Sequence, residues 1–192
     1  MPELVLASTS IHRRTLLERL GVPFRSRRPL VDEEVIRDDS LSPRNLAQFL
    51  ARAKALSVAA VEPHAVVLGG DQVVAFGGRV HGKPGTVVGA VEQLLELAGN
   101  SHQLVTAIAV CHQGQVVDYD DVTTLWMRPL TRPEAERYVL ADQPLDCAGS
   151  YKIEQRGITL FERIESSDHT AITGIPMIAL TTILRGLGFS IP

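Results

Sequence analysis

The chain has 192 residues, of which 45% are hydrophobic and 21% charged, and its formal net charge is −3. These values are typical of a soluble globular protein with one domain, and they exclude the global positive field of many nucleic-acid-binding proteins. No run of about 18 apolar residues is present, so we expect no membrane span.

The two cysteines, Cys111 and Cys147, form no C-x-x-C pair. We therefore predict neither a zinc site nor a disulfide framework, and we expect both thiols to lie in the core of a protein from a reducing compartment. The amino-terminus leads directly into a short strand, without the basic and long apolar segments of a secretory signal. These features favour a cytoplasmic protein.

The first informative segment is an apolar run at 4–7, which predicts a buried strand, followed by a helix expected over 11–20. Three hydroxyl residues lie between them, Ser8, Thr9 and Ser10, and the helix opens with His12, Arg13 and Arg14. Unpaired amides in a helix's first turn bind anions, so this turn suggests a phosphate site. The simpler alternative is that Ser10 only caps the helix and that the arginines are solvated.

A strand is predicted at 24–28, an acidic loop at 30–42, and a helix from Ser42-Pro43 to about residue 60. Asp32 and Glu33 in the loop are candidate oxygen ligands for Mg²⁺ or Mn²⁺. Lys54 lies in the helix among alanines, where it either reaches out from a closely packed helix or is solvated.

A buried strand at 65–68 is expected to be interrupted by Gly69-Gly70-Asp71-Gln72. An aspartate between glycine and glutamine at a strand's end can orient water or hold a metal, although it can also bond its own backbone in a turn. A hairpin over 73–81 leads to Gly82-Lys83-Pro84, where a lysine on a rigid turn can contact phosphate or remain a surface lysine. The Walker A spacing is absent.

The remaining pattern predicts helices at 86–97, 131–140 and 174–187, long strands at 104–112 and 115–127, and strand or irregular pieces at 148–151 and 158–164. Strands and helices alternate around antiparallel ribbons. We therefore predict an α/β fold with a mixed, strongly twisted sheet and flanking helices, in a single domain spanning 1–192.

Ordered motifs across nearly the whole chain resemble the Maf family of nucleoside triphosphate pyrophosphatases. They are Leu-Ala-Ser-x-Ser-x-x-Arg-Arg, Val31-Asp32-Glu33, Ala53-Lys54-Ala55, Gly-Asp71-Gln, Gly82-Lys83-Pro84, and segments at 147–154, 157–161 and 173–176. The chain is most similar to the branch described as 7-methyl-GTP pyrophosphatase, which has Cys-Ala-Gly-Ser-(Phe/Tyr)-Lys-x-Glu where the dTTP/UTP branch typically has Ala-Gly-x-Tyr-x-Ile-Gln.

This resemblance implies an inosine triphosphatase-like fold, with two lobes around a cleft, in a cytoplasmic homodimer. It implies that water cleaves a nucleoside triphosphate between the α and β phosphates and that Asp71 accepts the proton. It implies that phosphate is held by Ser8, Arg13, Lys54 and Lys83. Glu33 and Asp71 would share Mg²⁺ or Mn²⁺.

The resemblance also assigns base selectivity to His12, Gln72 and Glu154. A carboxylate at Glu154 can accept hydrogen bonds from a guanine's N1–H and amino group. The branch usually has Pro-Trp where this chain has Ile11-His12, and tryptophan stacks better on a cationic methylated purine. The leading prediction is a house-cleaning enzyme for 7-methyl-GTP or another modified nucleotide; the alternatives are a dTTP/UTP pyrophosphatase and a nucleotide-binding regulator of cell division or septum formation.

Overall fold

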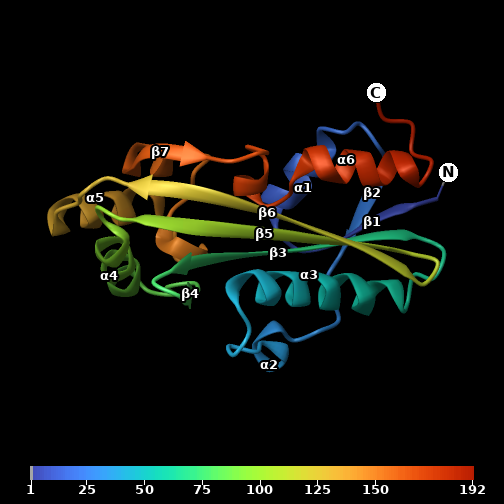
Figure 1. The fold of residues 1–192 in the computed structure, drawn as a ribbon, viewed down its shortest axis with the longest axis horizontal. Coiled ribbons are helices and arrows are strands. Elements are labelled where there is room, and N and C mark those ends of the chain that lie inside the picture. Colours follow the sequence, from blue (N-terminus) through green and yellow to red (C-terminus); the bar gives the residue numbers. More distant parts are fainter. Residues whose placement is uncertain (1) are drawn as a thin grey trace. The chain divides into compact units, whose positions relative to one another are not determined.

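The computed structural model describes residues 2–192, which form a mixed α/β structure (Figure 1). The strands are β1 (Leu4–Ala7), β2 (Phe24–Arg27), β3 (Val66–Phe76), β4 (Arg79–His81), β5 (Ser101–His112), β6 (Gln115–Met127) and β7 (Phe161–Glu165). The α-helices are α1 (Ile11–Glu18), α2 (Glu33–Ile36), α3 (Pro43–Ala59), α4 (Val87–Leu97), α5 (Arg132–Asp142) and α6 (Met177–Gly186). The 3₁₀ turns are η1 (Ala148–Ser150), η2 (Arg156–Leu160) and η3 (Ala171–Thr173).

The seven strands form one mixed sheet in the order β2-β1-β3-β5-β6-β7, with β4 paired to β3. Strand β1 is parallel to both β2 and β3, whereas the β3–β4 and β6–β7 pairs are antiparallel. The predicted mixed sheet is confirmed. In the register of β1 and β3, Ala7 lies opposite Gly69, so the chain leaves β1 at Ser8 beside the Gly70-Asp71 segment.

The chain divides into two compact units, and β3, β5 and β6 each pass from one to the other. The first unit comprises the chain up to Gln72, Thr106–Asp121 and Asp168–Pro192. The second comprises Val73–Val105 and Val122–Ser167. The predicted single domain with a cleft between two lobes remains a prediction.

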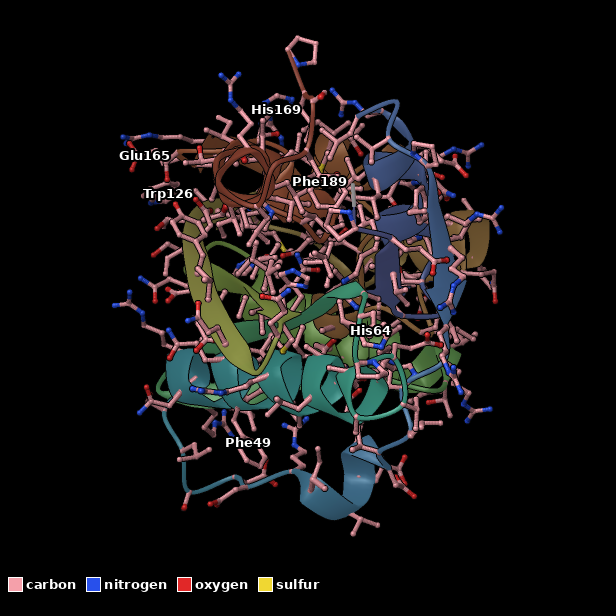
Figure 2. The ribbon with its side chains drawn as sticks, turned by 90° about the vertical axis from the view of Figure 1, so that its right-hand side faces the viewer. Phe49, His64, Trp126, Glu165, His169 and Phe189 are labelled. Carbon is pink, nitrogen blue, oxygen red and sulfur yellow. The ribbon has the colours of Figure 1, made fainter. Side chains whose placement is uncertain are left out.

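In the first unit, α1 and α6 cover one face of the sheet and α3 covers the other (Figure 1). The α1–α6 side is packed with aliphatic side chains that include Leu6, Leu17, Leu68 and Leu180. Residues alternate between faces along a strand, so even-numbered residues of β3 face this core and odd-numbered ones face α3. On the far side of α3, Phe49 points outward and is 42% exposed (Figure 2).

The structure corrects three boundary predictions. Strand β3 is continuous through Gly69-Gly70-Asp71-Gln72, because both glycines keep ordinary backbone angles and the pairing with β1 reaches Gly69. The acidic loop contains a short helix, α2, whose N-cap Asp32 accepts a hydrogen bond from the amide of Glu34. The last helix begins at Met177, because Gly174 has a φ of +121°.

The predicted hairpin turn and the capping box are confirmed. The β3–β4 hairpin turns at Gly77-Gly78, whose φ values of 57° and 76° suit glycine, and a capping box opens α5. Cys111 is buried as predicted, but the core position predicted for Cys147 is wrong, because Cys147 is only partly buried.

None of the helices described for residues 2–192 has the length and hydropathy of a membrane span.

Candidate functional site

Lys54 of α3 stands at the centre of a charged cluster in the first unit. It is only 8% exposed, and its Nζ lies 2.6 Å from Oδ1 of Asp71 and 2.6 Å from Oε2 of Glu33. Asp71 is itself only 4% exposed. Three residues predicted from separate motifs therefore meet, and the solvated alternative for Lys54 is wrong.

Close packing of α3 on β3 brings the cluster together. A Cβ on Gly69 would lie 2.4 Å from the carbonyl oxygen of Ala51 and 2.8 Å from the Cβ of Ala55, so only glycine permits this approach. Lys54 lies between these two alanines on the helix, and Asp71 is two residues beyond Gly69 on the same face of β3. The alanines and the glycine thus set the distance between ammonium and carboxylate.

The turn after β1 is built by serine hydroxyls. Ser8 is 6% exposed, and its Oγ accepts a hydrogen bond from the amide of Ser10 at 3.1 Å. Ser10 is the N-cap of α1, because its Oγ accepts from the amide of Arg13 at 3.4 Å. The capping predicted for Ser10 is confirmed.

The two arginines that open α1 have different surroundings. Nε of Arg13 donates to the carbonyl of Gly174 at 3.2 Å, and its side chain runs over Gly70 and Gly174, where an added Cβ would lie 3.2–3.3 Å from its atoms. Arg14 is exposed and pairs with Glu18 one helical turn later at 3.2 Å. Arg13 therefore joins the site, whereas Arg14 is a solvated residue of the helix face.

Gln72 points to the opposite face of β3 from Asp71, because it is the next residue along the strand. Its Nε2 lies 2.8 Å from Oγ1 of Thr106 and 3.0 Å from each of the carbonyl oxygens of Ala171 and Ile172. Carbonyl oxygens only accept hydrogen bonds, so the amide nitrogen must face them. The oxygen Oε1 is then the atom that Gln72 can offer to a ligand.

The charges in this cluster oppose the effects of burial. Burial raises the pKa of Asp71 above its ordinary value, and the nearby positive charges of Lys54 and Arg13 counteract that rise. Burial lowers the pKa of Arg13 from its ordinary value, against the opposing influence of Asp71 and Glu33. A buried carboxylate with a raised pKa is suited to accept a proton.

Glu33 and Asp71 are the residues in this cluster that can ligate a divalent cation. An oxygen of each carboxylate lies 2.6 Å from the one Nζ of Lys54. Mg²⁺ takes oxygen ligands at about 2.1 Å and usually binds through one or two carboxylates plus phosphate oxygens and water. The two carboxylates supply the oxygen ligands that such an ion takes, and in this structure both contact the ammonium of Lys54. Within residues 2–192 no cluster of three or more His, Cys, Asp or Glu could hold a metal.

The other predicted residues have these positions. His12 is the second residue of α1 and is half-buried. Lys83 and Glu154 belong to the second unit, and both are exposed, Lys83 between β4 and α4 and Glu154 in a turn before η2. Their participation in a site with Asp71 remains a prediction.

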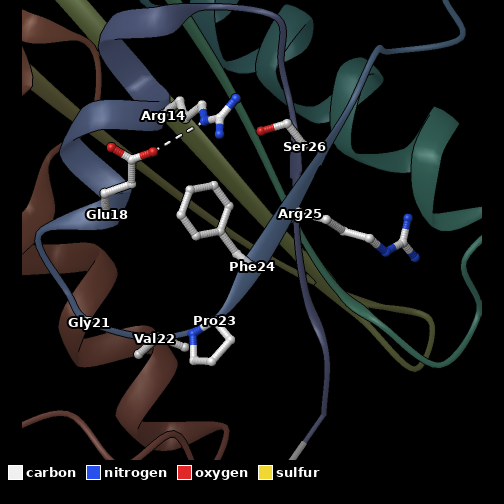
Figure 3. A pocket seen from close by; sticks show the side chains of 8 residues that line it. All are labelled: Arg14, Glu18, Gly21, Val22, Pro23, Phe24, Arg25 and Ser26. Carbon is white, nitrogen blue, oxygen red and sulfur yellow. Dashed lines mark hydrogen bonds and ion pairs between the residues drawn. The ribbon is translucent and has the colours of Figure 1, made fainter.

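A pocket of about 620 Å³ lies elsewhere in the first unit, between α1 and β2 (Figure 3). It is lined by Arg14, Glu18, Gly21, Val22, Pro23, Phe24, Arg25 and Ser26. Of the residues in the predicted phosphate-binding turn, only Arg14 lines it, and none of the residues to which the resemblance gives a role does so. Its arginines already have carboxylate partners, Glu18 for Arg14 and both Glu3 and Glu62 for Arg25.

The segment 168–174 holds two residues of the candidate site, a role that the sequence did not predict. The carbonyls of Ala171 and Gly174 hold Gln72 and Arg13. Buried Asp168 secures the segment, since its Oδ1 accepts from Thr170 and its Oδ2 accepts from the amide of Ile178 at 2.7 Å. The motif Thr-Gly-Ile-Pro at 173–176 signalled the place, but its role depends on backbone carbonyls, which a sequence motif does not reveal.

The sequence of this chain is similar to those of known proteins. A family model described as Maf-like protein matches residues 3–187. A protein of Bdellovibrio bacteriovorus named 7-methyl-GTP pyrophosphatase is 50% identical over 95% of this chain and 96% of its own. Proteins of the same name from Xanthomonas axonopodis (46% identical, all of both chains) and Aromatoleum aromaticum (45%, 99% of this chain and 98% of its own) also match. A solved dITP/XTP pyrophosphatase from Mycobacterium abscessus is a distant likeness, with a TM-score of 0.40 and 15% identity over 98% of each chain.

Proposed function

Because this chain belongs to the Maf family, we propose that it is a nucleoside triphosphate pyrophosphatase acting on 7-methyl-GTP or another modified nucleotide. Water attacks the α-phosphorus, the bond to the oxygen bridging α and β phosphates breaks, and a nucleoside monophosphate and pyrophosphate leave. The observation that carries this proposal is the Glu33–Lys54–Asp71 cluster, in which Lys54 and Asp71 are buried, in a chain so similar over its full length to relatives of that name.

Asp71 is the proton acceptor in this mechanism. Its carboxylate takes the proton from the attacking water, so the water oxygen gains nucleophilic character as the new bond to phosphorus forms. Burial supports the role, because it raises the pKa of Asp71 and makes the carboxylate a stronger base. Lys54, whose Nζ lies 2.6 Å away, counteracts this rise and favours the ionised carboxylate.

The cations serve to hold the triphosphate and to stabilise the charge that develops on the leaving pyrophosphate. Arg13 is half-buried and Lys54 is buried. Water therefore screens their charges less than it screens charges on the surface. Ser8 donates its hydroxyl proton to a phosphate oxygen, and its Oγ is oriented by the amide of Ser10. Lys83 contacts the phosphates from the second unit.

Glu33 and Asp71 would hold a Mg²⁺ or Mn²⁺ ion. When bound, the ion would supply positive charge to the phosphates and lower the pKa of a bound water. The support for this part is that both carboxylates contact the same ammonium, at 2.6 Å each, so the two side chains converge on one place.

His12, Gln72 and Glu154 are proposed to read the base. The acceptor oxygen of Gln72 and the carboxylate of Glu154 both suit a base edge that carries N–H donors, as guanine's does. We further propose that the active form is a homodimer in the cytoplasm.

A substrate panel with pyrophosphate detection tests the function. Purified protein in Mg²⁺ or Mn²⁺ is given 7-methyl-GTP, GTP, dTTP and UTP at equal concentrations. We expect the highest kcat/KM with 7-methyl-GTP and one pyrophosphate per monophosphate. A preference for dTTP or UTP would reject the substrate assignment, and release of orthophosphate alone would reject the cleavage site.

A further inference from the structure

The Gly82–Lys83–Pro84 turn in the second unit is held by a side chain to which no motif assigns a role. Gln93 lies on α4, and its Nε2 donates to the carbonyl oxygen of Gly82 at 3.1 Å. Its Oε1 accepts a hydrogen bond from Oγ of Ser150 at 2.5 Å. Both ends of the amide are used, so the orientation of Gln93 is determined.

Ser150 is well suited to hold Gln93 in place. Its side chain is fully buried, and a buried hydroxyl is normally hydrogen-bonded. Its φ of +60° is uncommon for a residue with a side chain. The preceding Gly149 has a φ of +78°, and a Cβ there would lie 2.7 Å from the ring of Tyr151. The backbone of this segment is thus constrained, and it directs the hydroxyl toward Gln93.

Further contacts anchor the turn beyond Lys83. The amide of Gly85 donates to the carbonyl of Leu145 at 3.0 Å. The carbonyl of Pro84 packs so closely on Gly89 that a Cβ there would lie 2.9 Å away. The backbone is therefore anchored on both sides of Lys83, while the lysine side chain itself remains exposed.

We propose that Gln93, oriented by Ser150, is a positioning residue for Lys83. It holds the turn in the conformation from which the ammonium meets the phosphate chain of the nucleotide. This inference rests on the proposed function, because it takes Lys83 to be a phosphate contact. Preorganised charge stabilises a transition state more than charge that must first be ordered, so loosening the turn weakens catalysis even though the lysine remains.

A double-mutant cycle tests the proposal. Gln93→Met keeps the length and apolar volume of the side chain but removes both hydrogen bonds; Lys83→Met removes the charge. We expect Gln93→Met to lower kcat/KM about tenfold. If Lys83→Met acts on kcat, Gln93→Met should also act on kcat, and if Lys83→Met acts on KM, Gln93→Met should also act on KM. In the Lys83→Met background, Gln93→Met should cause no further loss. The matched control is Gln103→Met, an exposed glutamine of β5 in the same unit, which should be unchanged.

The outcomes separate this inference from the proposed function. If Lys83→Met is impaired while Gln93→Met behaves as wild type, the positioning role is rejected and the function stands. If Gln93→Met lowers activity as much without the lysine as with it, Gln93 supports only the fold, and the inference is likewise rejected. If Lys83→Met is itself unimpaired, the proposed role of Lys83 is wrong and the inference is rejected with it. Should Gln93→Met fail to fold, Ser150→Ala replaces it in the same cycle.

Discussion

Nζ of Lys54 lies 2.6 Å from Oδ1 of Asp71, and both side chains are buried. The carboxylate proposed as the base is therefore charge-compensated before any nucleotide arrives. The same ammonium also lies 2.6 Å from Glu33, so one cation serves two carboxylates. Because a buried charge that loses its partner is strongly destabilising, changes at this cluster should have effects well above those of surface substitutions.

Replacing Asp71 by asparagine should abolish the base while conserving the shape of the side chain. We expect kcat for pyrophosphate release to fall by about 10²–10⁴-fold, the usual contribution of a general base, with nucleotide binding largely intact. The measurements are pyrophosphate release and calorimetric binding of the nucleotide. The control is Asp39→Asn, an exposed aspartate of the acidic loop. Turnover of Asp71→Asn close to that of wild type would remove Asp71 from the role of base.

The activity should also depend on pH through Asp71. Burial raises the pKa of Asp71, so its carboxylate becomes protonated, and inactive as a base, at a higher pH than an ordinary aspartate. In the metal-free protein, NMR titration should therefore give the Asp71 carboxyl a pKa above about 3.9, the usual aspartate value. A pKa at or below that value would contradict the effect of burial; metal is left out because a bound cation would itself lower this pKa.

Removing the ammonium of Lys54 should change metal binding as well as catalysis. In Lys54→Met, Glu33 and Asp71 lose their shared cation, so we expect lower kcat but tighter Mn²⁺ binding by the free protein. Calorimetric titration with Mn²⁺ in the absence of nucleotide measures this directly. Arg52→Met is the matched control, because Arg52 is an exposed cation on the same helix, paired with Asp118 at 3.2 Å. Unchanged or weaker Mn²⁺ binding in Lys54→Met would argue against a cation site at these carboxylates.

The close approach of α3 to β3 predicts a stability effect at Gly69. A methyl group there would meet the carbonyl of Ala51 at 2.4 Å, and backbone must move to accept it. We expect Gly69→Ala to lower the free energy of unfolding by about 1–3 kcal/mol and to lower kcat, since Lys54 moves with the helix. Gly186→Ala has nothing within 4 Å of the added Cβ and should be neutral or slightly stabilising in chemical denaturation. Equal stabilities for the two variants would contradict the packing argument.

Buried His102 predicts a pH dependence of stability that is separate from catalysis. Burial, with the charge of nearby His81, lowers the pKa of His102 to about 4 from 6.5. As the pH falls below 6.5, the unfolded chain binds a proton at this histidine while the folded chain does not, so stability is lost between pH 6.5 and 4. The loss attributable to His102 is about 3 kcal/mol.

Chemical denaturation across this pH range checks the effect. His102→Gln should show a shallower decline in the free energy of unfolding than wild type. His64→Gln, at an exposed histidine, should decline as wild type does. Parallel curves for wild type and His102→Gln would show that the imidazole is not held neutral by the fold.

Much of the local structure can be predicted from sequence, because its causes lie within a few residues. The strand at 4–7, the cap at Ser10 and the glycine turn at 77–78 depend on hydrophobic pattern, hydroxyl side chains and positive φ. Strand β3 was expected to break at Gly69-Gly70 because glycine often marks a turn. It continues because pairing with β1 and packing of α3 outweigh that local preference.

The sequence by itself singled out Arg13, Glu33, Lys54 and Asp71 as candidate site residues, because each stands in one of the ordered motifs that resemble the Maf family. Only the tertiary structure decided that one lysine neutralises two carboxylates, that the amide nitrogen of Gln72 contacts the carbonyls of Ala171 and Ile172, and that Arg13 donates to the carbonyl of Gly174. The physical reason is that these relationships join elements 17 to 161 residues apart. Strand alternation and helix packing set the distances between them, and motif spacing carries no such information.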